Sequence, residues 1–325
     1  MFYSIRHITK FTYSGAVSES IMETRMHPRS EGNQHCLTFQ LAVSPRARVF
    51  SYRDYLGNNT HYFDVAGYHN ALAIVAEALV DIQPPDSLPW SLRESAWSEV
   101  DKLIEDHDCW DALRPSEFAR PSGELLELSR TLNVAERRDD PLSLLRQLNT
   151  GLFHWFDYAP KTTRVDSPIE HALCERKGVC QDFAHIMITM VRQLGIPCRY
   201  VSGYLFHSAG AQDRSSDGAT HAWVEALLPN LGWVGFDPTN NLIAGPRHIR
   251  TAVGMDYADV PPTRGVFKGN VSSELSVKVR VDPSDSLPPA LDGIESSEDW
   301  TVVALPEPEP NLNPYASQQQ QQQQQ

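Results

Sequence analysis

The sequence lacks a long hydrophobic run, a disulfide pattern and an excess of positive charge. Its 325 residues contain no run of eighteen apolar residues, so we expect no membrane-spanning helix and no membrane partner. The N-terminus has no basic-then-apolar signal segment and no small-residue cleavage site, so we expect a cytoplasmic protein. The cysteines are odd in number and scattered, which is not a disulfide framework: Cys36, Cys109, Cys174, Cys180 and Cys198.

Metal ligands and basic patches are equally sparse. One group of candidate zinc ligands lies close together in the sequence: His171, Cys174, Cys180 and His185. Its spacing fits no common zinc pattern, so we expect neither a metal nor another cofactor. Of the net charge of −13, the eight acids after Arg280 account for −8 and residues 1–280 for the remaining −5. This mildly acidic body argues against nucleic acid as a partner.

Residues 1–80 show the alternation of apolar and polar side chains that is typical of strands. The segments are Tyr3–Tyr13, Leu37–Val43, Tyr55–Phe63 with a turn signal inside it, and His69–Val80, whose alanines also fit a helix. Short strands separated by turns predict a small β-sandwich as the first domain.

Residues 81–281 form the predicted second domain, which mixes helices and strands into an α+β fold. Helical spacing covers Ser91–Asp106, Ser122–Leu132, Pro141–Phe156 and a buried helix at Cys180–Leu194. Asp140 before Pro141 is typical of a helix N-cap, and Gly195 is typical of a helix stop. Strand patterns follow at Cys198–Phe206, His221–Leu227, Gly232–Phe236 and Leu275–Val281.

The last segment, residues 282–325, is rich in proline and acid and ends in eight glutamines. It lacks the apolar surface that folding requires, so we expect it to be disordered. Trp300–Leu305 is apolar and is expected to dock on the body of the protein or on a partner.

Cys180 stands at the predicted start of the buried helix. Free N–H groups and the positive end of the helix dipole stabilise a thiolate there, although a packed, inert cysteine fits the position equally well. A reactive thiol needs a base. His185 is five residues along the helix, about 140° around it, and so points elsewhere. His221, which opens a strand, is the better candidate.

Asp237 ends the strand that follows His221, so the register of the hairpin decides whether the two meet. If the turn centres on Pro229, His221 faces Asp237, and the carboxylate can orient the imidazole. If it centres between Asn230 and Leu231, Asp237 faces Val224 and the pair is lost. Alone, Asp237 would fit a turn aspartate before Pro238.

Three ordered motifs resemble the bacterial transglutaminase-like proteins. They are Gly-Val-Cys-Gln-Asp-Phe-Ala-His (178–185), His-Ala-Trp-Val-Glu (221–225) and Gly-Trp-Val-Gly-Phe-Asp-Pro-Thr-Asn (232–240). The segment 195–204 and the N-terminal Pro28-Arg29 and Asp54-Tyr55-Leu56-Gly57-Asn58 also resemble the family, so the likeness covers residues 1–281. The resemblance implies a papain-like core, in which the helix carrying the nucleophile packs on an antiparallel sheet.

The resemblance further implies a triad of Cys180 as nucleophile, His221 as base and acid, and Asp237 as the orienting group. The thiolate would attack the carbonyl of an amide in a protein or peptide substrate and form a thioester. The backbone N–H of Cys180 is one oxyanion donor, and Tyr158 is the candidate for a second; Trp155 better fits a core aromatic.

Two departures from the animal cross-linking enzymes favour hydrolysis over amine transfer. Gln181 stands where those enzymes carry tryptophan, and no acidic loop has calcium-site spacing. An amine-accepting transglutaminase and a non-catalytic binding protein that keeps the fold remain alternatives. The loop Ser208–Thr220 is expected to be a mobile flap beside His221.

Overall fold

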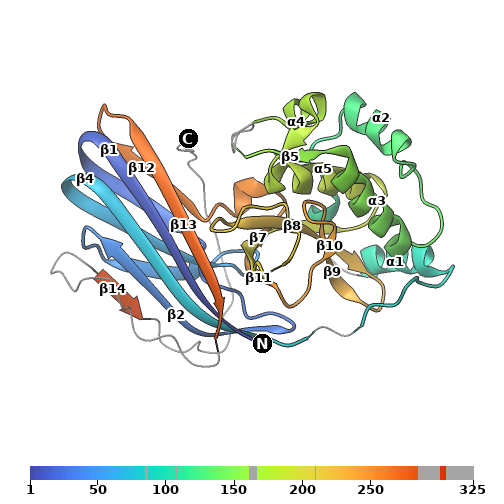
Figure 1. The fold of residues 1–325 in the computed structure, drawn as a ribbon, viewed down its shortest axis with the longest axis horizontal. Helices are drawn as coiled ribbons and strands as arrows, with labels where there is room; N and C mark the ends of the chain where they lie inside the picture. Colours follow the sequence, from blue (N-terminus) through green and yellow to red (C-terminus); the bar gives the residue numbers. More distant parts are fainter. Residues whose placement is uncertain (85–86, 107–108, 161–166, 209, 285–300, 305–325) are drawn as a thin grey trace.

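The computed structural model describes residues 1–84, 87–106, 109–160, 167–208, 210–284 and 301–304. A large antiparallel sheet and a helix-covered smaller sheet lie side by side (Figure 1). This is the predicted α+β arrangement, in which the unit of helices and strands follows the N-terminal strand region. Within the described residues, no helix is long and apolar enough to cross a membrane.

The large sheet is built on two long strands, β1 (Phe2–Thr24) and β4 (Asn59–Ile82), which pair along most of their length. The pairing slips between Thr12 and Glu19, and each half has its own outer neighbours. Buried side chains from both halves of the sheet belong to one hydrophobic cluster. The single sheet therefore encloses one core, as the two layers of a sandwich do. Its shorter strands are β2 (Gln34–Ser44), β3 (Val49–Arg53), β12 (Thr263–Lys268), β13 (Ser273–Pro283) and β14 (Thr301–Ala304).

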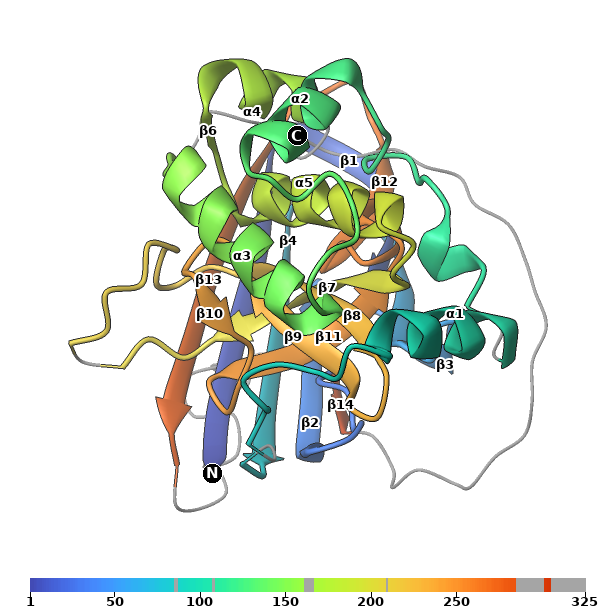
Figure 2. The same cartoon turned by 90° about the vertical axis from the view of Figure 1, so that its right-hand side faces the viewer.

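The smaller sheet has the order β10-β9-β8-β7-β11 and is antiparallel throughout. Its strands are β7 (Cys198–Leu205), β8 (His221–Leu228), β9 (Gly232–Asp237), β10 (Leu242–Ile243) and β11 (His248–Gly254). The helices gather on one side of it (Figure 2). They are α1 (Ala96–Asp106), α2 (Gly123–Thr131), α3 (Pro141–Trp155), α4 (Ile169–Glu175) and α5 (Cys180–Gln193), with short 3-10 turns at Asp111–Leu113 (η1) and Tyr257–Asp259 (η2).

Helix α5 is the buried centre of this unit, and every residue from 181 to 192 is buried. Its contacts run to β8 and β7 on one side and to α3 on the other. At the start, the Asp182 carboxylate accepts the Val179 N–H at 2.8 Å. At the end, Gly195 adopts φ +70°, which confirms the predicted helix stop. The predicted cap of α3 is confirmed too, because Asp140 accepts the N–H groups of Leu142 and Ser143.

The C-terminal part of the chain returns to the large sheet. Residues 263–268 and 273–281, which the sequence had placed with the second domain, pair with β1 in β12 and β13. Residues 282 and 283, which were predicted to begin the disordered tail, extend β13 along β1. Residues 301–304 form β14 along β2, as expected for a docking segment. The tail predicted to be disordered, residues 282–325, is described only at 282–284 and 301–304, where β13 ends and β14 lies; residues 285–300 and 305–325 lie outside the described residues.

Two buried amides join the sheets. The outer edge of β11 is met by Asn58, whose side chain donates to the Val253 carbonyl and accepts the Val253 N–H, each at 2.8 Å. Gln34 makes the same double contact with the Arg250 backbone, also at 2.8 Å. Each amide imitates a paired strand, so the edge of β11 has its hydrogen bonds satisfied by the large sheet. The Asn58 motif noted in the sequence therefore serves to dock the two units.

Several histidines are buried in a neutral form, and this predicts acid-sensitive stability. Burial lowers the pKa of His7, His61 and His185 to about 4 and that of His27 to about 3. The unfolded chain, with a histidine pKa near 6.5, binds more protons than the folded one in this window, so stability falls with pH from about 6.5 to about 4. At pH 5 we expect a loss of about 2 kcal/mol per histidine. Urea unfolding at pH 7 and pH 5 measures it.

A single substitution checks the cause. His61 lies 5.2 Å from the Phe39 ring, and both of its ring nitrogens lack partners among the described residues, so phenylalanine should fit its site. The His61→Phe variant should lose part of the pH dependence while keeping its stability at pH 7. If the unfolding free energy of the wild type were equal at pH 7 and pH 5, the prediction would be contradicted.

Candidate active site

Cys180 is the first residue of α5 and is half-buried. The chain reaches it through a short parallel pair of strands, β5 (Asp157–Tyr158) and β6 (Lys177–Gly178). Gly178 is required there, because a Cβ would lie 2.7 Å from the Asp182 carboxylate that caps the helix. The first N–H groups of a helix have no helical acceptor, so the thiol sits at a local source of positive potential.

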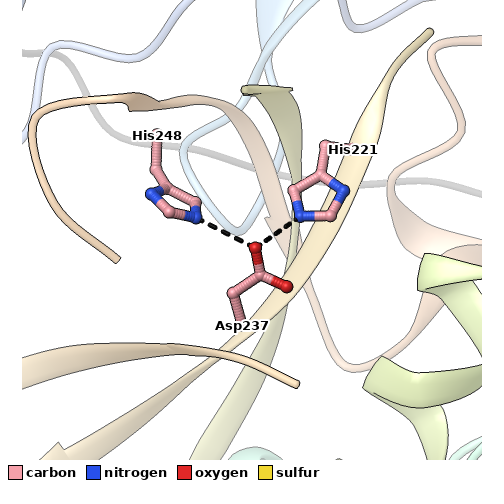
Figure 3. A group of neighbouring side chains, drawn as sticks. All are labelled: His221, Asp237 and His248. Atoms are coloured by element: carbon pink, nitrogen blue, oxygen red, sulfur yellow. Dashed lines mark hydrogen bonds and ion pairs between the residues drawn. The ribbon is translucent and has the colours of Figure 1, made fainter. Parts of the chain in front are cut away.

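His221 and Asp237 meet at the ends of two neighbouring strands. The Nε2 of His221 lies 2.8 Å from Oδ2 of Asp237, and both side chains are almost wholly buried. In Figure 3 the other ring nitrogen of His221 faces away from the carboxylate. That nitrogen, Nδ1, is buried and makes no hydrogen bond of ordinary geometry with the described residues. Nδ1 is therefore the ring nitrogen that Asp237 does not occupy.

The register that brings the pair together differs from the predicted one. The hairpin centres on Asn230, with Leu228 opposite Gly232, and not on Pro229. The expectation that His221 stands directly opposite Asp237 is therefore wrong. A shift by two residues along one strand keeps side chains on the same face, so Asp237 reaches His221 diagonally. The turn centre lies one residue later than Pro229, at Asn230, which adopts φ +61° and so places the bend there.

The electrostatics of the pair favour a charged imidazole. Burial alone would lower the pKa of His221, but the Asp237 carboxylate, helped by Cys180, raises it to about 10. Burial would raise the pKa of Asp237, yet His221 and then His248 hold it well below its usual range. Both shifts favour an ionised Asp237 beside a protonated His221.

Two residues beside Asp237 were missed in the sequence as parts of the site. His248 places Nε2 3.2 Å from Oδ2, and the Asn240 amide donates to the same oxygen at 2.8 Å. The other oxygen, Oδ1, accepts the backbone N–H groups of Thr239 and Asn240. Asn240 belongs to a family-like motif, which was a usable signal. His248 follows Gly-Pro-Arg in a pattern that carries no signal of its own.

The same side chains are the one metal-compatible group found in the described part of the chain. The ligand atoms of His221, Asp237 and His248 lie within 4.8 Å of one another. A metal-bound histidine usually donates its second ring N–H to an acceptor. Nδ1 of His248 instead faces a donor, the Gly245 N–H, at 3.2 Å. The arrangement fits hydrogen bonding better than metal binding.

The four candidate zinc ligands of the sequence do not converge in this way. His185 is buried, and its Nε2 accepts the Tyr257 N–H at 3.2 Å. Cys174 is exposed on α4. The His185 ring packs against Phe118 and Tyr200, with ring centres 5.5 Å and 5.1 Å away.

The candidate oxyanion residue Tyr158 lies next to the nucleophile loop. It pairs with Gly178, two residues before Cys180. Its hydroxyl is 3.2 Å from the Ser216 hydroxyl and accepts the Ser216 N–H at 3.3 Å. An oxygen that accepts one bond can still donate its own proton, so its role as a donor stays a prediction. Trp155 ends α3, with the Arg176 guanidinium 4.3 Å from its ring centre, as expected of a packed aromatic.

The loop expected to be a flap is tied to the site. The N–H groups of Arg214 and Ser215 both donate to the Asn240 side-chain oxygen, at 2.7 Å and 3.1 Å. Asn240 in turn contacts Asp237, so one amide holds both the loop and the carboxylate. Burial, and then the neighbouring Cys180, raise the pKa of Tyr257 to about 12.

Comparison with known proteins gives a consistent family. Residues 129–238 match the transglutaminase-like superfamily, and residues 3–81 match the bacterial transglutaminase-like N-terminal region. An uncharacterized protein of Mycobacterium leprae is 31% identical over 277 residues, which cover 85% of this chain and 96% of that protein. An uncharacterized protein of Mycobacterium tuberculosis is 33% identical over 307 residues, covering 86% and 92%.

Two further likenesses concern proteins whose names refer to an activity. A protein-glutamine gamma-glutamyltransferase of Pseudomonas aeruginosa is 29% identical over 156 residues, covering 47% of this chain and 22% of that protein. A candidate cysteine protease of Cytophaga hutchinsonii has a solved structure with a TM-score of 0.69 at 22% identity, covering 94% of this chain and 98% of that chain. The second likeness supports the fold alone.

Proposed function

The chain belongs to the transglutaminase-like superfamily of cysteine-based acyl-transfer enzymes, and from this premise we propose that it hydrolyses amide bonds through a Cys180 thioester. The substrate class would be a protein or peptide that carries a carboxamide, peptide or isopeptide bond. The observation that carries the proposal is the buried 2.8 Å contact between Asp237 and His221, which lies on the strand against which the helix that begins at Cys180 packs.

The chemistry follows from that geometry. The Cys180 thiolate attacks the amide carbonyl, a C–S bond forms, and negative charge develops on the carbonyl oxygen. The helix N-terminus and the Cys180 N–H are placed to stabilise that charge. His221 then gives its proton to the leaving amine as the C–N bond breaks. Water attacks the thioester, returns a proton to His221 and releases the acid and the free thiolate.

Amine transfer is the second candidate, and the partial likeness to the Pseudomonas glutamyltransferase favours it. The two reactions share every step up to the thioester and differ only in whether water or an amine resolves it. We favour water because Gln181 stands where the animal cross-linking enzymes have tryptophan.

Two measurements test the proposal. At neutral pH, limiting iodoacetamide should alkylate Cys180 at least about ten times faster than the exposed Cys174, because the imidazolium stabilises the thiolate of Cys180 alone. Peptide mass spectrometry gives the rate at each cysteine. Incubation with a library of glutamine-containing and isopeptide-linked peptides should then release ammonia or amine without incorporating a fluorescent primary amine.

The outcomes separate the readings. Equal alkylation of Cys180 and Cys174 would contradict both enzymatic readings and leave a binding protein. Rapid alkylation with stoichiometric amine incorporation would replace hydrolysis by transfer.

A further inference from the structure

We propose that His248 is a positioning residue that donates a hydrogen bond to Asp237 and so holds the carboxylate that orients His221. The inference rests on the proposed function, and it adds a fourth side chain to the site. His248 lies on β11, which is separated from the His221 strand by β7, so it reaches Asp237 from the opposite side (Figure 3).

The hydrogen bonds of His248 fix its tautomer. The Gly245 N–H donates to Nδ1 at 3.2 Å, so Nδ1 carries no proton. In a neutral imidazole the proton must then sit on Nε2, which faces Oδ2 of Asp237 at 3.2 Å. A backbone donor thus determines that His248 acts as a donor, and not as a base, toward the carboxylate.

The charges around His248 favour the neutral ring. The groups that face it are Asp237, His221 and Arg247, and burial together with the two cations outweighs the attraction of the one carboxylate, so the pKa of His248 lies below its usual value. His221 takes the charge of the pair instead. One carboxylate therefore has a charged and a neutral histidine at the same oxygen, with separate roles.

The placement of His248 depends on both units of the protein. It opens β11, where it pairs with Leu205 of β7. Two residues further on, the Arg250 backbone is held by the Gln34 amide of the large sheet. The ring also packs edge-on against Trp223, 5.2 Å between centres. Strand pairing, docking and packing each restrict the imidazole, so its N–H is fixed before substrate binds.

Three proteins test the role: the wild type, His248→Phe and His248→Gln. Phenylalanine keeps a ring against Trp223 but has no N–H, and glutamine restores a donor. The rate of Cys180 alkylation by iodoacetamide at pH 7 should fall about tenfold in His248→Phe and return to within about threefold of the wild type in His248→Gln. With a peptide substrate in hand, kcat should fall and KM should stay, because no substrate contact is lost.

The unmodified protein supplies an independent readout and a control. A long-range 1H–15N spectrum at pH 7 should show His248 protonated on Nε2 alone; a ring protonated on Nδ1, or on both nitrogens, would overturn the proposal. His69→Phe, at a buried histidine of the large sheet that bonds Ser20, should leave alkylation unchanged. A folded His248→Phe variant whose Cys180 is alkylated at the wild-type rate would also overturn the positioning role of His248. If iodoacetamide did not alkylate Cys180 of the wild type rapidly, the result would count against the proposed function. The spectrum would still determine the tautomer of His248.

Discussion

Replacing Cys180 with alanine is expected to lower kcat/KM for amide hydrolysis by at least about 10⁴-fold, because the covalent route disappears with the sulfur atom. His221 and Asp237 remain but have no nucleophile to serve. The thiol is half-buried at a helix start, so its loss should change the melting temperature by only a few degrees. Steady-state kinetics on the best library substrate, with thermal unfolding beside them, measure both effects.

Cys198 offers the matched control. It is wholly buried on β7 under α5, with its sulfur 3.6 Å from the Ile188 carbonyl, and burial raises its pKa to about 11. The Cys198→Ala variant should therefore lose about 1–2 kcal/mol of stability and keep its turnover. A Cys180→Ala enzyme that keeps a tenth of the wild-type rate would show that the reaction does not pass through this thioester.

The helices of the core were predictable because their signals are local. Asp140, Pro141 and Gly195 begin or end helices through hydrogen bonds and backbone angles that involve near neighbours. The buried face of α5 could also be recognised from its apolar spacing. The predicted range for this helix, 180–194, differs from the observed one by a single residue.

The long strands were less predictable because their extent depends on distant partners. β4 runs from residue 59 to 82, although Gly67 and the segment around it interrupt the alternation that marks a strand. A slip in the pairing with β1 absorbs this interruption, and only the partner strand shows where it falls. The pairing of residues 273–283 with β1 was unpredictable for the same reason. The alternation of apolar and polar residues indicates a strand but not the sheet to which the strand belongs.

In the site, the residue types and the shared strand face could be predicted from the sequence, whereas the register of the hairpin could not. Because side chains alternate between the two faces of a strand, Asp237 and His221 could be expected on the same face. The position of the turn, at Asn230, determines which residue of β8 lies directly opposite Asp237. His248 could not be found from the sequence alone. Its approach to Asp237 depends on β11 crossing to the far side of β7, a contact between strands that are separated by long connections.

Asp237→Asn should have an effect almost as large as the loss of the thiol, with kcat lowered by roughly 10³- to 10⁴-fold. An amide cannot accept from His221, His248 and Asn240 at the same oxygen as well as a carboxylate does. The pKa of His221 would fall from about 10, because the opposing charge that outweighs burial is gone. The thiolate–imidazolium pair would then be lost at neutral pH, and pH–rate profiles of the two proteins should show it.

Stability gives the same variant a second signature, and its sign follows from the His221 pKa. A group whose pKa is raised on folding stabilises fully below its unfolded value near 6.5, and that contribution is lost as pH rises to about 10. The wild type should therefore lose a few kcal/mol of unfolding free energy between pH 7 and pH 9.5 that Asp237→Asn does not lose. Asp140→Asn is the control, since asparagine caps a helix as well as aspartate does and the α3 cap does not touch His221. If Asp237→Asn instead kept the wild-type kinetics and the wild-type loss of unfolding free energy between pH 7 and pH 9.5, the carboxylate would neither orient nor charge His221. That result would mean that only the thiol and the imidazole act in the reaction.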